Sequence, residues 1–297
     1  MRVFVTGASG WIGSAVVPEL LAAGHEVVGL ARSDVAAAAI AAAGATPHRG
    51  GLDDLDSLRA GAAAADGVIH LGFNHDFSDM AGAGRTERAA VETFGSTLAG
   101  SDRPLLVASG VALLAPGRVV TERDVTPMSG PDAPRGGGEH LALSYAERGV
   151  RSVSLRFAPT VHGDGDHGFL ATIVGVARDT GTSAYVGDGA NRWPAVHRFD
   201  AARMVRLALE QAPAGAIVHG VAEEGIAARD IAASVGRALG LPVSSVAPDQ
   251  AYGHFGWISA FFALDIPASS ALTQQTLGWT PTHPGLLDDL AAGSYTR

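Results

Sequence analysis

Two amino acids with distinctive chemistry are missing from this 297-residue chain: it has no cysteine, and its 21 basic residues are all arginine, so lysine is absent as well. Without cysteine there is no disulfide framework and no thiolate metal site, which fits a reducing compartment. Redox chemistry must then come from a cofactor. Without lysine, a Schiff base and a Walker-type phosphate loop are excluded, because arginine does not lose its proton in practice.

Long apolar runs are missing too. None reaches the ~18 residues of a membrane span, and the N-terminus, Met1–Val5, lacks the basic and apolar regions of a signal peptide. The formal net charge of -9 disfavours duplex DNA and anionic lipid as partners, because both need clustered cations. With 47% hydrophobic residues the chain can bury a full core. We expect a cytoplasmic protein whose partner is a small molecule, with no nucleic acid and no membrane bound.

The first half of the chain alternates short apolar runs with longer alanine-rich amphipathic stretches, which is the rhythm of βαβ units. The expected strands are Arg2–Thr6, Glu26–Leu30, Thr46–His48, Gly67–Leu71, Pro104–Ala108 and Ser152–Phe157. The expected helices are Trp11–Ala23, Ser33–Ala42, Asp54–Ala63, Ala81–Ala99 and Ala133–Glu147. The pattern predicts an α/β fold with one doubly wound parallel sheet.

The second half is less regular. It has glycine-rich loops at His162–Gly168 and Gly187–Ala190 and helical patterns near Ala201–Gln211 and Ala227–Leu239. We therefore expect the sheet domain over residues 1–163, and over residues 164–297 mainly a small C-terminal substrate-binding subdomain that is interleaved with it.

A glycine-rich turn stands between the first strand and the first helix. The segment from Thr6 to Gly13 has the spacing G-x-x-G-x-x-G, which is weak as a pattern but strong at this position. The first glycine permits a tight turn, the second allows close approach of a diphosphate, and the third allows the helix to pack on the strand. Free N–H groups at the helix start then bind the anion. The predicted cofactor-binding residues here are Thr6, Gly7, Ser9, Gly10, Trp11, Ile12 and Gly13.

The end of the second strand indicates which dinucleotide is bound. A site selective for NAD usually has a carboxylate where Ala31 stands, whereas Arg32 and Ser33 suit a 2′-phosphate. We therefore expect NADP(H). The alternative is that Arg32 is a solvated surface residue and Asp34 caps a helix. Three further residues complete the predicted cofactor site: Asp53, which either meets the adenine or begins a helix, Leu71 and Gly72.

Four segments together give the chain a family resemblance. They are the turn T-G-x-x-G-x-x-G, Leu105–Ser109, the strand Ser154–Arg156 followed by Val161–Gly163, and Leu277–Pro281. The chain resembles the extended and atypical short-chain dehydrogenase/reductase superfamily, which includes NAD(P)-dependent epimerases, dehydratases and carbonyl reductases. The resemblance implies a Rossmann domain with a small C-terminal substrate subdomain.

The chain departs from that family at its catalytic motif, Tyr-x-x-x-Lys. Lysine does not occur, and none of the four tyrosines completes the motif; the family spacing puts Pro131 at the tyrosine position and Arg135 at the lysine position. Arg135 can still clamp ribose hydroxyls, but it cannot relay protons. Alternatively, it pairs with Glu139 one turn away. Ser109 is the predicted contact to a substrate carbonyl, although Gly110 fits the family's serine position as well.

Histidine is the natural replacement for the missing acid. We expect His162, after the sixth strand, to be catalytic together with Ser109 and Arg135. The predicted substrate-binding residues lie in a glycine-rich loop region, whose packing on the core is the competing explanation; they are Tyr185, Asn191, Arg192 and Trp193. The histidine spacings do not fit a metal site, so none is expected.

The sequence favours an NADPH-dependent reductase of a small ketone, aldehyde or imine. Two alternatives stay open: a non-catalytic NADP-binding redox sensor, and a non-redox isomerase or cyclase that uses the same fold. An aromatic cluster near the C-terminus fits a core, a lid or the seam of a homodimer; its members are Phe255, Trp257, Phe261 and Phe262.

Overall fold

Seven parallel strands form the central sheet, in the order β10-β6-β5-β4-β1-β2-β3. The computed structural model describes residues 1–74, 79–112 and 114–296. The strands of this sheet are β1 Arg2–Thr6, β2 Glu26–Ala31, β3 Thr46–Arg49, β4 Gly67–His70, β5 Pro104–Gly110, β6 Arg151–Phe157 and β10 Ala216–Gly220. Their central members are buried on both faces, as runs of β-branched and apolar residues require.

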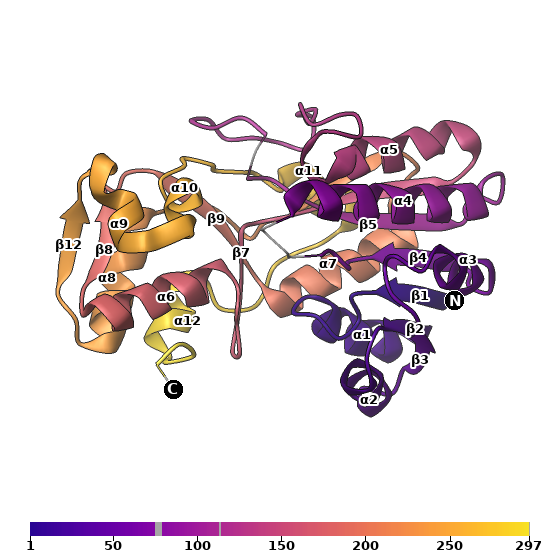
Figure 1. The fold of residues 1–297 in the computed structure, drawn as a ribbon, viewed down its shortest axis with the longest axis horizontal. Helices are drawn as coiled ribbons and strands as arrows, with labels where there is room; N and C mark the ends of the chain where they lie inside the picture. Colours follow the sequence, from indigo (N-terminus) through magenta and orange to yellow (C-terminus); the bar gives the residue numbers. More distant parts are fainter. Residues whose placement is uncertain (75–78, 113, 297) are drawn as a thin grey trace.

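Helices cover both faces of this sheet (Figure 1). On one face, α1 Gly13–Ala22, α2 Asp34–Ala42 and α7 Arg198–Gln211 pack over one apolar cluster. On the other face, α3 Leu55–Ala63, α4 Met80–Leu98 and α5 Gly138–Ser144 pack over a second. The doubly wound α/β fold is confirmed.

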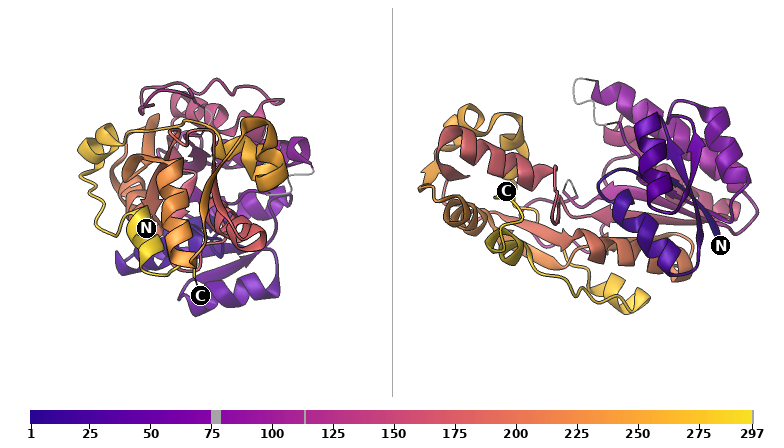
Figure 2. Two further views of the ribbon diagram at one scale, coloured as in Figure 1. Left: turned by 90° about the vertical axis from the view of Figure 1, so that its left-hand side faces the viewer. Right: turned by 90° about the horizontal axis from the view of Figure 1, so that it is seen from below.

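The C-terminal part of the chain builds a second lobe (Figure 2). Its strands form a three-stranded sheet, β7 Thr160–His162, β9 Arg192–His197 and β11 Glu223–Ala227, and a parallel pair, β8 Ser183–Val186 and β12 Val243–Val246. Its helices are α6 Phe169–Thr180, α8 Ala228–Leu239, α9 Ala251–Phe255, α10 Ser259–Phe262 and α12 Leu286–Ala291. An apolar cluster of their own holds these elements together. The short helix α11 Ala271–Leu277 instead lies against α7 and β10.

The structure corrects several sequence predictions. The seventh strand, β10, was not expected; with α7 it returns the chain to the central sheet after the second lobe has begun. The helix predicted over 133–147 is three pieces: the 3-10 turns Pro134–Gly137 and Tyr145–Arg148 flank α5. Three predicted loop residues lie on strands: Tyr185 on β8, and Arg192 and Trp193 on β9. Within the described chain, no helix combines the length and apolar character of a membrane span.

Candidate functional site

The glycine-rich turn has little room for side chains. Gly7 adopts a φ of +67°, and the Gly10 N–H donates to its carbonyl at 2.9 Å. A Cβ on Gly13 would lie 2.0 Å from the Gly7 carbonyl oxygen. Any residue other than glycine at position 13 would therefore prevent α1 from packing this closely on the turn. The sequence places glycine where the backbone needs it.

This turn leaves donors for an anion. Among the described residues, nothing accepts a hydrogen bond from the backbone N–H of Trp11 or Ile12, which stand just before α1. Such N–H groups and the helix dipole suit a dinucleotide's diphosphate. The Trp11 side chain is otherwise engaged: its indole N–H donates to the Val161 carbonyl at 2.7 Å, and the Arg198 guanidinium lies 4.0 Å from the ring centroid. Only the Trp11 backbone is therefore available to the cofactor.

The end of β2 carries an arginine, Arg32, for which the described residues offer no hydrogen-bond or ion-pair partner. Arg32 is exposed, and in the described part of the chain no acceptor contacts its guanidinium. The Ser33 hydroxyl accepts from the Ala36 N–H at 3.2 Å and caps the N-terminus of α2. The alternative interpretation expected Asp34 to be this cap, which is wrong. Asp34 instead forms an ion pair with Arg49, whose strand β3 runs alongside β2.

The remaining predicted cofactor residues are near the same edge of the sheet. The Leu71 N–H donates to the Thr6 carbonyl at 3.2 Å, and the Gly72 N–H donates to the Thr6 hydroxyl at 3.1 Å. These bonds join the end of β4 to the glycine turn. Asp53 is exposed and precedes Asp54, which caps α3.

A buried polar line runs from the glycine turn to Arg135. The Thr6 hydroxyl bonds His70 Nδ1 at 2.6 Å, His70 Nε2 bonds Glu87 at 3.2 Å, and Arg135 donates to Glu87 at 3.2 Å. His70 and Glu87 are almost fully buried, whereas the Arg135 side chain keeps 34% of its surface exposed. The alternative pairing of Arg135 with Glu139 is wrong, because the helix that would bring them one turn apart is broken.

Glu139 takes part in a different buried network. Ser109 on β5 donates to one of its carboxylate oxygens, and Arg156 on β6 donates to the other, with its Nε at 2.9 Å. Register aligns Ser109 with Arg156 on neighbouring strands. Arg156 is fully buried and also donates to the Asp124 carbonyl at 2.8 Å. A serine hydroxyl at the carboxyl end of β5 is thus backed by a fixed carboxylate.

His162 lies in a third cluster and is fully buried on β7. Its Nδ1 bonds Asp289 at 2.7 Å, and its ring contacts His197 edge to face. His197 in turn stacks on His283, and burial lowers the pKa of His197 to about 4. In this conformation the His162 ring offers no surface to a substrate, so its role as a proton donor stays a prediction.

The predicted substrate residues are engaged in packing. The Asn191 amide donates to the Phe262 carbonyl at 2.8 Å, and Arg192 forms two 2.9 Å bonds with Asp265. Trp193 is 1% exposed in the core of the second lobe, and Tyr185 is half-buried on β8. These contacts agree with the competing explanation of loop packing; substrate contact stays untested.

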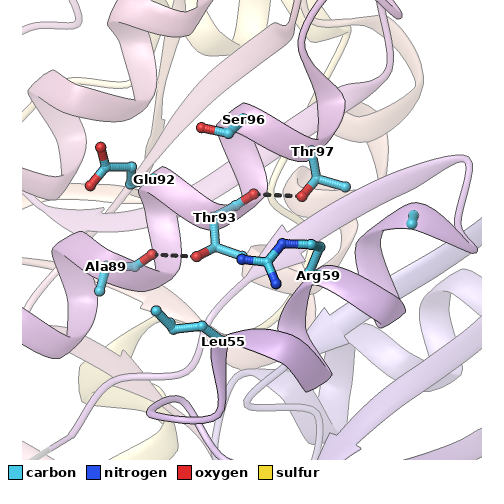
Figure 3. Close-up of a pocket in the computed structure, with 8 residues that line it drawn as sticks. Leu55, Arg59, Ala89, Glu92, Thr93, Ser96 and Thr97 are labelled. Carbon is cyan, nitrogen blue, oxygen red and sulfur yellow. Dashed lines mark hydrogen bonds between the residues drawn. The ribbon is translucent and has the colours of Figure 1, made fainter.

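Two other features of the described residues bear on possible chemistry. They contain no cluster of three or more acidic or histidine side chains arranged to hold a metal. A surface hollow between α3 and α4 includes Arg59, Glu92, Thr93 and Thr97 in its lining (Figure 3). Two of its threonine hydroxyls donate to backbone carbonyls of α4. None of the hollow's lining residues is a predicted site residue.

Sequence reasoning missed Glu87, His70, Arg156 and Asp289. The available signal was a charged or histidine side chain inside a strand that is otherwise apolar, as with His70 in β4 and Arg156 in β6. Such a residue must find a buried partner.

Comparison with known proteins gives two levels of similarity. The model of the NAD dependent epimerase/dehydratase family matches residues 3–219. The uncharacterized protein C2A9.02 of Schizosaccharomyces pombe is 51% identical over 99% of this chain and 100% of its own length. The uncharacterized protein YLL056C of Saccharomyces cerevisiae is 45% identical over 98% of each.

More distant similarities are also found. A 4-hydroxy-2-methyl-3-oxo-4-farnesyl-3,4-dihydroquinoline-1-oxide ketoreductase of Stigmatella aurantiaca is 29% identical over 73% of this chain and 67% of its own. Among solved structures, Pal from Bacillus thuringiensis has a TM-score of 0.80 at 18% identity, covering 100% of this chain and 99% of its own. The dTDP-glucose 4,6-dehydratase DesIV from Streptomyces venezuelae, solved with NAD and TYD, has a TM-score of 0.77 at 24% identity, covering 99% and 96%. These structures share the fold.

Proposed function

Because the chain belongs to the NAD-dependent epimerase/dehydratase family, we propose that it is an NADP(H)-dependent oxidoreductase that reduces a small ketone, aldehyde or imine. The observation that carries the proposal is the Ser109 hydroxyl, half-buried at the carboxyl end of β5 and bonded to the fixed carboxylate of Glu139. Ligands of doubly wound sheets bind at the carboxyl ends of the strands.

The residues present fit a dinucleotide. The N–H groups of Trp11 and Ile12 would hold the diphosphate, and the glycines at positions 7 and 13 allow the tight turn that places these groups at the start of α1. Arg32 would bind the 2′-phosphate of NADP(H), since its guanidinium is unpaired among the described residues and stands where an NAD site usually carries a carboxylate. The bound cofactor supplies or accepts the hydride.

The protein must then handle one proton. In the direction of oxidation, the alcohol oxygen gives its proton to Ser109 Oγ while the Ser109 hydroxyl proton passes to Glu139. In reduction these proton moves run in reverse: Glu139, after taking up a proton from solvent, would pass it to Ser109 Oγ while the Ser109 hydroxyl proton passes to the new alkoxide. Arg156 orients the carboxylate by holding its second oxygen. This pair takes the place of the tyrosine that the family motif has and this chain lacks.

The similarity to a ketoreductase supports a carbonyl substrate. To test the proposal, NADPH consumption by the purified protein is followed with a panel of ketones, aldehydes and cyclic imines. We expect turnover with at least one class, and loss of that turnover in Ser109→Ala with NADPH affinity unchanged. Tight NADPH binding with no turnover across the panel would instead favour a redox sensor or a non-redox enzyme.

A further inference from the structure

Arg135 stands in a left-handed turn. Its φ and ψ are 54° and 27°, and Gly136 and Gly137 continue the turn with φ of 60° and 62°. Only Asp102 and Arg135 have positive φ among the described residues that are not glycine. The left-handed conformation is sterically unfavourable for a residue that has a Cβ atom. It persists where the surrounding structure enforces it, and such residues often lie at functional sites.

The surroundings of this turn enforce it from helix α4. A Cβ on Gly136 would lie 2.1 Å from the Gly84 carbonyl oxygen, so the turn packs directly on the helix backbone. The Arg88 guanidinium donates to the Gly136 carbonyl at 3.1 Å. The backbone position of Arg135 is therefore set by the packing of this turn on α4.

Glu87, which lies between Gly84 and Arg88 on α4, holds the head group of Arg135. Glu87 accepts from Arg135 and from His70, both at 3.2 Å, in a site where its own side chain is 2% exposed. Burial opposes its ionisation, but His70 and Arg135 outweigh burial, so the pKa of Glu87 lies below its ordinary value. An arrangement in which the Thr6 hydroxyl bonds His70 Nδ1 and His70 Nε2 donates to Glu87 gives both ring nitrogens a partner in this line.

Arg135 is left with donors to spare. In the described structure its Nε and Nη1 have no acceptor, and its guanidinium lies 4.3 Å from the Phe73 ring centroid, beyond the end of β4. Because Glu87 balances its charge, Arg135 is better suited to hydroxyl oxygens than to a free anion. We infer that Glu87, backed by His70, is a positioning residue that aims Arg135 at the hydroxyls of the nicotinamide ribose. This inference rests on the proposed function.

The test separates the two halves of the cofactor. Dissociation constants of NADPH and of adenosine 2′,5′-bisphosphate, which lacks the nicotinamide half, are measured for Glu87→Gln and Arg135→Ala. Since a charge-assisted hydrogen bond is lost, we expect each variant to weaken NADPH about tenfold and to leave the bisphosphate within about twofold. Arg135→Lys should restore part of the affinity. Glu92→Gln, the same substitution on the exposed face of α4, is the matched control and should change neither ligand.

The double variant decides whether Glu87 acts through Arg135. With Arg135→Ala already present, Glu87→Gln should have no further effect on NADPH. A further loss in that background, equal losses of both ligands, or unchanged NADPH affinity in Glu87→Gln would overturn the inference. Wild-type protein that binds neither NADPH nor NADH would instead remove the proposed function, and this inference with it.

Discussion

Replacing Arg32 with alanine should remove the preference for NADPH over NADH. The guanidinium is exposed and unpaired in the described structure, and the nearest acidic side chain along the chain, Asp34, is already neutralised by Arg49. A phosphate would therefore receive the full charge of Arg32. Hydrogen bonds to charged groups contribute about 2 kcal/mol net, so NADPH affinity should fall about 30-fold while NADH affinity stays within about twofold.

The assay is calorimetric titration of both dinucleotides into wild type and Arg32→Ala. Because the site is at the surface, the NADPH advantage of wild type should shrink between about 0.1 and 1 M salt as screening increases. Arg49→Ala is a second informative variant: it frees the Asp34 carboxylate beside the 2′ position and should also shift preference toward NADH. Equal losses of NADPH and NADH in Arg32→Ala would refute the assignment of a 2′-phosphate site.

Three further predictions concern the turn, the proton and the second lobe. Gly13→Ala should abolish dinucleotide binding, because its Cβ would lie 2.0 Å from a carbonyl oxygen of the turn; retained affinity in a titration would contradict this. Glu139→Gln should lower kcat by about a hundredfold and leave the NADPH dissociation constant unchanged; parallel losses would indicate a structural role only. Since burial lowers the pKa of His197 to about 4, against ~6.5 when unfolded, stability is complete above about pH 6.5 and is lost as pH falls toward 4. In urea unfolding, the free energy of unfolding of the wild type should fall by about 1 to 2 kcal/mol between about pH 7 and 5. This fall should be absent in His197→Gln and present in the exposed control His140→Gln. An equal fall in both variants would contradict the prediction.

The central sheet was predictable because its strands are short, apolar and separated by helices of ordinary pattern. The six expected strands are all present, with bounds that differ by no more than two residues. The glycine turn was equally accessible, since its spacing and its position between strand and helix reinforce each other.

The second lobe was harder for a definite reason. Strand β9 contains Pro194, which cannot donate to a ladder and so argues against a strand. The structure accommodates it where the pairing with β11 is irregular, between Glu223 and Ile226. Strand β10 has only five residues and follows a proline and two small residues, so it gives little periodic signal.

The polar contacts of the site were out of reach for another reason. Their spacing of four residues favoured an ion pair between Arg135 and Glu139. In the structure Arg135 pairs with Glu87, 48 residues away, and Glu139 pairs with Arg156, 17 residues away. Tertiary packing decides such pairs, and the left-handed turn at Arg135 is what separates the two neighbours. Only the residue types at the end of β5 could be inferred, not the carboxylate behind them.

The Trp11 side chain links the glycine-rich turn to β7 of the second lobe. The backbone of this residue lies beside the first helix, but its indole is fastened to Val161 and covered by Arg198, which belong to segments beyond the sixth strand. Any ligand that moves the indole must break those contacts. If dinucleotide binding disturbs these contacts, then by reciprocity of linked equilibria a molecule that strengthens them would change dinucleotide affinity by the same factor by which the dinucleotide changes the affinity for that molecule.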